Sequence, residues 1–339
     1  MIIGLPNLTN KNMNVHNMKK IALITSGGDS PGMNACIRAI VRTARAENID
    51  VIGFYRGYEG LIDDDHIQLT KSKVSNIIHR GGTILKTARS KRFTTPEGMK
   101  KANETLEKHQ IDGLIVIGGD GSFKGALEFS KVHNIKTVGC PGTIDNDLIG
   151  TDFTIGYDTA TNTVVEAVDK IRDTAESHDR IFVVEVMGRD AGLIALRSAI
   201  ACGAEAILIP ERKNDLQTLL ENKKSWRLTK KSRIIIVAEG DENGGAVGIG
   251  NLLKKEWPEF DIRISILGHI QRGGNPTCME RVNASIMGYY AVKALQNGHN
   301  NEMIGIVNKQ VAYTHFRDAV KHIEDLNPEM MRILDVLSS

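Results

Sequence analysis

The feature that most constrains the fold is a series of short apolar runs, each followed directly by glycines or polar residues. IALIT (21–25), LIVIG (114–118) and IIIVA (234–238) are such runs, and none alternates between apolar and polar residues. Continuous apolar runs of this length are typical of strands buried on both faces, as in a parallel sheet. The stretches between them, such as ACIRAIVRTARAEN (35–48), have apolar residues at helical spacing. The pattern therefore predicts an α/β fold with doubly wound, mostly parallel sheets.

Length and composition narrow the class of protein. A chain of 339 residues exceeds what one hydrophobic core usually organises, so we expect two domains. The 43 Lys and Arg residues nearly balance the 41 Asp and Glu residues, which argues against a nucleic-acid-binding or membrane-surface protein. Cys36, Cys140, Cys202 and Cys278 are scattered and form no CxxC pair, which fits a reducing, cytoplasmic setting. Residues 1–17 lack the pattern of a secretory signal, and we expect them to be a disordered tail.

Two glycine clusters follow predicted strands, at the sheet edge where ligands bind in such folds. In TSGGDSPGMN (25–34), Gly27 and Gly28 allow the backbone to approach a phosphate at the start of a helix. A plain strand-to-helix turn is the alternative for this segment. In GGDGS (118–122), Asp120 lies among glycines, and Mg²⁺ between its carboxylate and a phosphate would relieve their repulsion. The alternative there is an Asp that caps a helix.

The segment PGTIDND (141–147) is the most informative one. Asp145 and Asp147 are two residues apart, so in an extended segment both would face the same side. One carboxylate can then take a proton while the other helps to hold Mg²⁺, and Thr143 adds a hydroxyl. A surface turn rich in Asp and Asn is the alternative for the motif in isolation.

Cationic and polar residues lie at the ends of several of the later predicted strands. Each alone would usually be a solvated surface residue, but several at strand ends suggest a pocket for a small anion such as a sugar phosphate. Arginine suits this ligand because its guanidinium pairs with two phosphate oxygens, and a glutamate can accept hydrogen bonds from sugar hydroxyls. The set comprises Arg180, Met187, Gly188, Arg189, Glu239, Arg263, His269 and Arg272.

The motifs TSGGDSPGMN, GGDGS, PGTIDND, EVMGRDAG and GHIQRGG stand together in this order. In order and spacing the chain resembles the bacterial ATP-dependent phosphofructokinases of type A, from about Lys19 to about Val320. The resemblance implies two Rossmann-like domains with the active site in the cleft between them. The implied larger, nucleotide-binding domain comprises residues 18–155 and 270–319, and the smaller, sugar-phosphate-binding domain comprises residues 156–269 and 320–339.

The resemblance also implies an activity. The family transfers a phosphoryl group from Mg²⁺-bound ATP to the 1-hydroxyl of fructose 6-phosphate, giving fructose 1,6-bisphosphate in the committed step of glycolysis. By this resemblance Asp145 is the general base, acting with Arg89, Thr143 and Asp147. The implied nucleotide side comprises Gly28, Arg89, Ser90, Gly119, Asp120 as the Mg²⁺ ligand, Gly121 and Ser122. The implied sugar-phosphate contacts are Thr143, Ile144, Asp145, Arg180, Met187, Gly188, Arg189, Glu239, Arg263, His269 and Arg272.

The family resemblance further implies self-association and regulation. Arg180 and Arg263 resemble arginines that a neighbouring subunit supplies, which implies a homotetramer. The family also has an effector site for ADP or phosphoenolpyruvate, whose residues match Arg38, Arg42, Lys71, Arg172, Glu205, Lys230 and Lys231. Lys71 stands where well-known members have Arg, so it keeps the charge but loses the two-pronged geometry. An exposed basic helix face is the alternative interpretation of Arg38 and Arg42.

Two alternative functions stay open at the level of the sequence. Pyrophosphate-dependent relatives typically carry Asp at position 121 and Lys at position 142, whereas both positions are Gly here, which favours ATP. A catalytically silent nucleotide sensor is the other alternative, although Asp120, Asp145 and Arg89 are intact. An NAD-dependent dehydrogenase is disfavoured because TSGGDSPGMN lacks the GxGxxG spacing.

Overall fold

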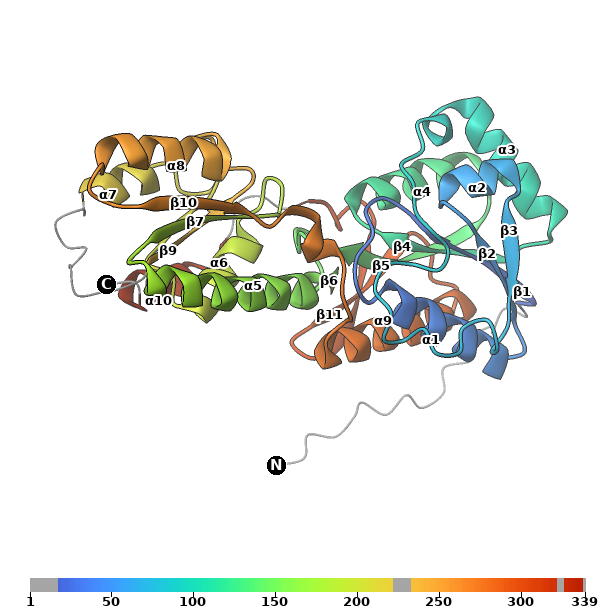
Figure 1. The fold of residues 1–339 in the computed structure, drawn as a ribbon. Helices are drawn as coiled ribbons and strands as arrows, with labels where there is room; N and C mark the ends of the chain where they lie inside the picture. The colour runs from blue at the N-terminus through green and yellow to red at the C-terminus, as the bar shows by residue number, and fades with distance from the viewer. Residues whose placement is uncertain (1–17, 222–232, 322–325, 338–339) are drawn as a thin grey trace.

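The chain folds around two sheets that lie in two lobes (Figure 1). The computed structural model describes residues 18–221, 233–321 and 326–337. The tail predicted at residues 1–17 lies outside the described residues. None of the helices in the described part combines the length and the apolar character that crossing a bilayer requires.

The larger lobe contains an eight-stranded sheet with the order β12-β11-β5-β4-β1-β2-β3, and β6 also pairs with β5. The inner strands are parallel, and the pairs β2–β3 and β11–β12 at the two edges are antiparallel. Its strands are β1 (Lys20–Thr25), β2 (Asp50–Phe54), β3 (His66–Leu69), β4 (Gly113–Gly118), β5 (Lys136–Thr143), β6 (Ile155–Gly156), β11 (Glu302–Val307) and β12 (Gln310–His315).

Helices cover both faces of this sheet (Figure 1). One face carries α1 (Met33–Ala46) and α9 (Cys278–Gln296). The opposite face carries α2 (Tyr58–Asp63), α3 (Pro96–Lys108) and α4 (Asp120–Val132), with the short 3₁₀ helix η1 (Arg92–Thr94) beside them. This is the arrangement that the unbroken apolar runs predict.

The smaller lobe contains a four-stranded, fully parallel sheet with the order β10-β7-β9-β8. Its strands are β7 (Ile181–Val186), β8 (Ala206–Leu208), β9 (Arg233–Ala238) and β10 (Ile262–Ile266). On one face lie α5 (Tyr157–Ser177), α6 (Leu193–Cys202) and α10 (Pro328–Leu337), and on the other lie α7 (Asp215–Glu221) and α8 (Gly245–Glu256). The 3₁₀ helix η3 (Gly268–Arg272) follows β10. The predicted fold class, doubly wound with mostly parallel sheets, is confirmed, whereas the domain limits stay a prediction.

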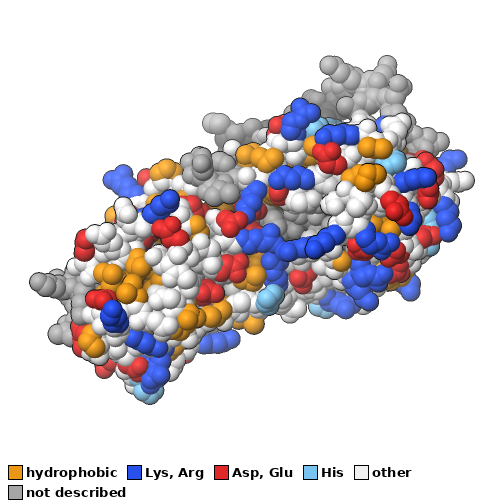
Figure 2. All heavy atoms as spheres, turned by 90° about the horizontal axis from the view of Figure 1, so that it is seen from above, with side chains coloured by type: hydrophobic (Ala, Val, Ile, Leu, Met, Phe, Trp, Pro, Cys, Tyr) orange, Lys and Arg blue, Asp and Glu red, His pale blue; other side chains and the backbone are white. Residues whose placement is uncertain are grey.

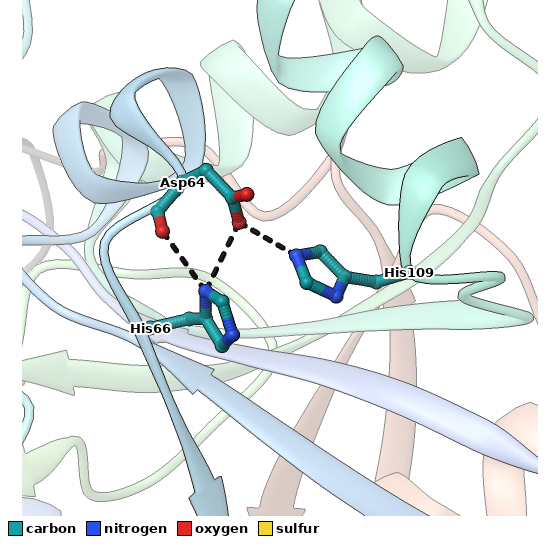
Figure 3. Close-up of side chains that lie close together, drawn as sticks. All are labelled: Asp64, His66 and His109. Atoms are coloured by element: carbon teal, nitrogen blue, oxygen red, sulfur yellow. Dashed lines mark hydrogen bonds and ion pairs between the residues drawn. The ribbon is translucent and has the colours of Figure 1, made fainter.

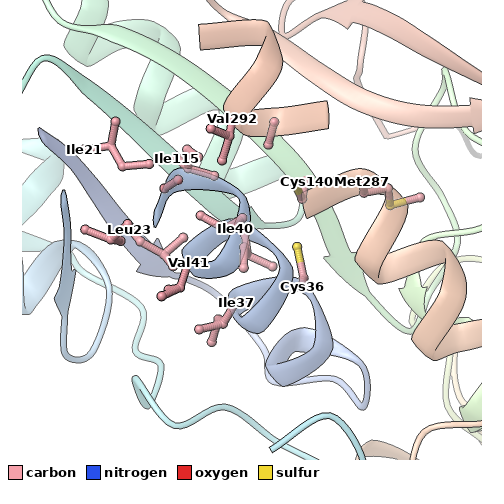
Figure 4. Packing of buried hydrophobic residues seen from close by; sticks show 14 of the residues in the cluster. Ile21, Leu23, Cys36, Ile37, Ile40, Val41, Ile115, Cys140, Met287 and Val292 are labelled. Carbon is pink, nitrogen blue, oxygen red and sulfur yellow. The ribbon is translucent and has the colours of Figure 1, made fainter. Parts of the chain in front are cut away.

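Strand β1 illustrates how the apolar runs build the core. Ile21 and Leu23 face the helices α1 and α9, whereas Ala22 and Ile24 pack on the opposite side of the sheet (Figure 4). Both faces of the sheet are therefore shielded from water at β1, and each fully buried aliphatic side chain contributes about 1.5–3 kcal/mol to folding. A Cβ at Gly288 of α9 would lie 2.7 Å from the carbonyl oxygen of Cys36, so only glycine permits this close approach of α9 to α1.

The strand register brings three of the predicted motifs to one level of the larger sheet. Thr25 of β1 pairs with Ile117 of β4, and Gly118 of β4 pairs with Pro141 of β5. The segments that follow these strands therefore leave the same edge of the sheet side by side. Residues that are far apart in the sequence become neighbours there.

Candidate active site

A cavity of about 370 Å³ lies where β1, β4 and β5 end. Arg189, which follows β7, and Arg272 of η3 also line it, so both lobes contribute to its wall. Figure 2 shows Lys and Arg side chains gathered across the middle of one face of the molecule. The residues predicted for the site that line the cavity are Gly28, Arg89, Ser90, Gly119, Asp120, Gly121, Ser122, Thr143, Asp145, Asp147, Arg189 and Arg272.

The glycines of the first two motifs leave backbone open toward this cavity. Gly27 has φ +90°, a conformation that favours glycine, and Gly119 precedes the first residue of α4. A Cβ at Gly121 would meet no protein atom within 4 Å. The free N–H groups at the start of α4 thus face an open space, which is the usual environment for a bound phosphate.

The segment that carries Arg89 is tied to the first glycine loop. Thr87 Oγ1 donates to the carbonyl oxygen of Gly27 at 2.9 Å. Nearby, the Tyr58 hydroxyl donates to the carbonyl oxygen of Ser122 at 2.7 Å, and the Tyr58 ring stacks on Phe93 at 3.9 Å between centroids. Both aromatic rings line the cavity, although no sequence motif singled them out.

Asp145 is the most deeply buried carboxylate of the cavity, with 3% of its surface exposed. Its Oδ1 atom has no hydrogen-bond partner in the protein, and its Oδ2 atom lies 3.5 Å from Nε of Arg189. Burial raises the pKa of the Asp145 carboxyl above its ordinary value, and the positive charges of Arg189 and Arg272 partly offset this rise. An unpartnered oxygen of a desolvated carboxylate is suited to accept a proton.

Asp147 lies beside it, but not because the chain is extended. Asn146 has φ +54°, so the backbone turns between the two carboxylates. The Asn146 side chain holds this turn, since its Oδ1 accepts from the amide of Thr154 at 2.6 Å. Both carboxylates line the cavity, as predicted, but the extended geometry from which we predicted this was wrong.

Lys321 is the cation that sequence reasoning missed. Its Nζ lies 3.6 Å from Oδ2 of Asp147 and 2.6 Å from Oδ2 of Asp190, and its side chain lines the cavity. Burial raises the pKa of the Asp147 carboxyl, the neighbouring Asp145 charge raises it further, and Lys321 lowers it. An isolated β-bridge between Leu148 and Lys321 brings this lysine to the site. The sequence around Lys321 contains no motif that would predict this position.

The carboxylates of this wall match the donors that Mg²⁺ prefers. Asp120 is the first residue of α4, and its Oδ2 accepts from Nζ of Lys124 at 2.7 Å, an exposed side chain that can turn away. Asp145 and Asp147 lie across the same cavity, and one oxygen of Asp145 is unpartnered. Hard carboxylate oxygens beside a phosphate-binding turn are a fitting donor set for Mg²⁺.

Several predicted sugar-phosphate contacts do not line the cavity. Glu239 Oε1 accepts from the amide of Arg189 at 2.9 Å and so orients the segment that carries this arginine. The amide of Met187 donates to Oε1 of the buried Gln271 at 3.2 Å, which ties this segment to η3, where His269 also lies. Gly188 has φ +138° between them. The Ile144 side chain is fully buried in the core of the smaller lobe.

Arg180 and Arg263 do not join the cavity of their own chain. Both bind Asp261, with Nε of Arg180 at 2.6 Å from Oδ2 and Nε of Arg263 at 2.9 Å from Oδ1. They lie at the amino ends of β7 and β10, whereas Arg189 and Arg272 follow the carboxyl ends of these strands.

The predicted effector residues divide between the lobes (Figure 1). Arg38 and Arg42 lie on α1, and exposed Lys71 follows β3. Burial, and then the charge of Arg42, lowers the pKa of Arg38. In the smaller lobe Nη2 of Arg172 donates to the carbonyl oxygen of Cys202 at 2.6 Å, and Oε2 of Glu205 accepts from the amide of Ile234 at 2.6 Å. Lys230 and Lys231 lie outside the described residues.

The two positions that separate the phosphoryl donors differ in the space around them. A Cβ at Gly142 would lie 2.9 Å from Cε of Met33 and 3.0 Å from Cγ2 of Ile117, so a side chain there would displace the core. At Gly121 the space is open. A side chain at position 142 would therefore require Met33 and Ile117 to shift.

Comparisons with known proteins show what the chain is similar to. Residues 20–295 match the family described as Phosphofructokinase. The chain is 50% identical over 322 residues to ATP-dependent 6-phosphofructokinase 2 of Bacteroides thetaiotaomicron, covering 95% of this chain and 99% of that protein. It is 51% identical over 322 residues to ATP-dependent 6-phosphofructokinase of Cytophaga hutchinsonii, covering 95% of this chain and 98% of that protein.

Solved structures share the fold. A phosphofructokinase from Saccharomyces cerevisiae superposes with a TM-score of 0.83 at 37% identity, covering 94% of this chain and 48% of that longer chain. A pyrophosphate-dependent phosphofructokinase from Marinobacter aquaeolei superposes with a TM-score of 0.82, covering 95% of this chain and 92% of that one. At 21% identity the latter likeness concerns the fold alone.

Proposed function

The chain belongs to the phosphofructokinase family, and we propose how its cavity performs the reaction of that family. Its activity is the ATP-dependent phosphorylation of fructose 6-phosphate at the 1-hydroxyl, a kinase reaction of glycolysis. Phosphoryl transfer needs a base for the attacking hydroxyl, cations for the charge that develops, and a rigid arrangement of both substrates.

Asp145 is the general base of this proposal. The single observation that carries it is a carboxylate that is almost fully buried, lines the cavity and has one oxygen without a partner. Burial increases the affinity of this carboxylate for a proton, while Arg189 at 3.5 Å favours its ionised, receptive form. Asp145 takes the proton of the 1-hydroxyl as the sugar oxygen attacks the terminal phosphate, and Thr143 helps to align that oxygen.

The phosphates of ATP bind at the glycine turns and the amino end of α4. Gly28, Gly119, Gly121, Ser122 and Ser90 form this side of the cavity. Arg89 and Arg272 supply positive charge close to the transferring group, where a fixed cation stabilises the transition state.

Mg²⁺ is the cofactor that this donor set fits. Asp120 would hold it, with Asp147 close by, because both carboxylates line the wall beside the phosphate turns. When bound, Mg²⁺ neutralises phosphate charge and orients the phosphate oxygens. The charge of Lys321, 3.6 Å from Asp147, favours the ionised form of that second carboxylate against the effect of burial, which raises its pKa.

The remaining family properties are part of the same proposal. Arg180 and Arg263 contact the sugar phosphate of a neighbouring subunit in a homotetramer, which is consistent with their position away from their own cavity. Glu239, Met187, Gly188 and His269 complete the sugar-phosphate side. ADP or phosphoenolpyruvate binds as an effector at the positively charged groups of α1 and the smaller lobe, and the enzyme works in the cytoplasm.

The choice of donor is tested directly. We expect fructose 1,6-bisphosphate to form with ATP and not with pyrophosphate when both donors are compared in parallel coupled assays. The physical reason is that Gly121 leaves open space where an Asp side chain would crowd and repel the nucleotide, and that position 142 carries no lysine. Equal or faster product formation with pyrophosphate would contradict this assignment.

A further inference from the structure

Two histidines and one aspartate form a compact cluster on the larger lobe, outside the cavity (Figure 3). Asp64 follows α2, His66 begins β3 and His109 follows α3. One candidate ligand atom from each residue lies within 4.8 Å of the other two, and no second group of this kind occurs in the part of the chain that the structure describes. We propose that Asp64, His66 and His109 bind a divalent transition-metal ion of the zinc type.

The distances are close to those of a metal centre. Asp64 Oδ1 lies 2.6 Å from Nε2 of His109 and 3.0 Å from Nδ1 of His66. Zinc bonds of about 2.0–2.2 Å in a tetrahedron separate neighbouring ligand atoms by roughly 3.3 Å. The carboxylate oxygen would have to withdraw by less than about 1 Å from each nitrogen, and the candidate ligand atoms of the two histidines lie within 4.8 Å of each other.

The histidine rings are oriented before any ion binds. They meet edge to face at 4.4 Å between centroids, and both contact the ring of Phe54, at 5.8 Å for His66 and 6.1 Å for His109. Phe54 is fully buried, so it forms a rigid apolar floor under the cluster. A fixed first shell of this kind reduces the entropy that ligand ordering would otherwise cost.

A second layer of contacts holds the aspartate. Lys108 Nζ donates to Oδ2 of Asp64 at 2.7 Å, which leaves Oδ1 directed at the two histidines. Such an outer partner orients the ligand and keeps it ionised. Lys108 is largely exposed, so its charge is well solvated and weakens the attraction for a cation only modestly. Asp64 itself has φ +57°, a conformation that Asp tolerates better than most residues.

Binding exchanges protons for the metal ion. Without metal, the contacts to Asp64 require a proton on Nδ1 of His66 and on Nε2 of His109, because a carboxylate can only accept. The ion takes the place of these protons: a neutral imidazole then carries its proton on its other ring nitrogen, whereas a protonated imidazole releases one proton to solvent. Imidazole nitrogen selects zinc, nickel, cobalt or copper over Mg²⁺, so the ion that accompanies ATP does not compete for this site.

The site joins three elements at the edge of the larger sheet. It clamps the end of α2, the start of edge strand β3 and the end of α3. An ion that binds only the folded chain stabilises it in proportion to the saturation of the site. The proposal therefore predicts a stabilising metal site that is independent of catalysis.

The test compares metal binding by full-length variants. Chelator-treated protein is titrated with Zn²⁺ in the presence of excess Mg²⁺, and with Co²⁺ to record visible absorption bands from an imidazole-bound ion. We expect wild-type protein and the surface control His178→Gln to bind a single zinc ion and to unfold at a higher temperature with zinc. Replacing both ligands, His66→Gln with His109→Gln, should lower the affinity by more than about tenfold and remove the thermal shift.

A second variant guards against loss of folding. Asp64→Asn preserves the shape and the backbone conformation but removes the charged ligand, so it should lose affinity while its metal-free melting curve stays close to that of wild type. Zinc binding that is unchanged in both variants would overturn the proposal, and would point to a thiol such as exposed Cys278. Failure of the wild-type protein to bind zinc supplied in excess over the protein would overturn it as well.

Discussion

Asp145→Asn is the change that tests the proposed mechanism most directly. Asparagine has the same shape as aspartate but cannot accept the hydroxyl proton. General-base catalysis supplies roughly 10²–10⁴-fold in rate, so we expect the turnover number to fall by this factor. The loss corresponds to about 3–5 kcal/mol of transition-state stabilisation.

The structure separates this effect from damage to the fold. The charges of Arg189, Arg272 and Lys321 offset the burial of the Asp145 carboxylate only in part, so the pKa of this carboxyl is raised and its ionised form is disfavoured in the folded chain. Replacing it with a neutral isostere relieves that cost and the repulsion with Asp147. We therefore expect the free energy of unfolding of Asp145→Asn to stay level or to rise.

The assay measures fructose 1,6-bisphosphate formation at saturating ATP and fructose 6-phosphate, next to thermal unfolding of the same preparation. Asp173→Asn on the exposed face of α5 is the matched control and should behave like wild type. In the wild type the turnover should fall on the acidic side at a higher pH than an ordinary aspartate would give, because burial raises the pKa of the base. A variant that keeps turnover within tenfold of wild type would refute the role of Asp145.

Three further outcomes follow from the same structure. Arg180→Ala should weaken binding of fructose 6-phosphate, measured as a raised KM, and mixing it with Asp145→Asn subunits should restore some activity; no recovery after verified subunit exchange would contradict its placement across an interface. Burial raises the pKa of Glu280 to about 7, so the folded chain binds a proton at this carboxyl more tightly than the unfolded chain does. This difference stabilises the folded chain at low pH, and the stabilisation is lost as pH rises from about 4.5 through about 7. Glu280→Gln should remove this pH dependence of the free energy of unfolding, which amounts to roughly 3 kcal/mol at most. Denaturant unfolding at several pH values measures it, and an unchanged pH dependence would assign the effect to other groups. Gly142→Ala should destabilise the fold by about 1–3 kcal/mol in urea unfolding, because its Cβ would lie 2.9 Å from a methionine side chain. Gly121→Ala should instead leave stability unchanged and weaken ATP binding. Equal melting curves for the two variants would refute this contrast.

The sheet architecture and the phosphate turns were predictable from local sequence. Unbroken apolar runs such as residues 21–25 indicate strands buried on both faces, and parallel strands place their carboxyl ends at one edge. The register of Thr25 with Ile117, and of Gly118 with Pro141, follows this rule. Asp120 and Asp145 could be singled out because their motifs directly follow such strands.

The turn at Asn146 could not be predicted, because its left-handed backbone is held by the amide of Thr154 across a loop. The contact of Lys321 with Asp147 also depends on a distant pairing, through the bridge between Leu148 and Lys321. No periodicity or spacing encodes such contacts, since each depends on where two separately folded segments meet.

The sequence by itself therefore determined the fold class and, through its family resemblance, singled out the glycine turns that we propose to bind phosphate and the carboxylate that we propose as the base. Only the tertiary structure decided which charges surround that carboxylate, because Arg189 after β7 and Arg272 in η3 reach it from distant segments of the chain. It also decided that Arg180 and Arg263 lie away from their own cavity, and that Asp64, His66 and His109 converge at the far edge of the sheet. The physical reason is that strand and turn preferences act between neighbours in the chain, whereas the electrostatics of a site sum over groups that packing alone brings together.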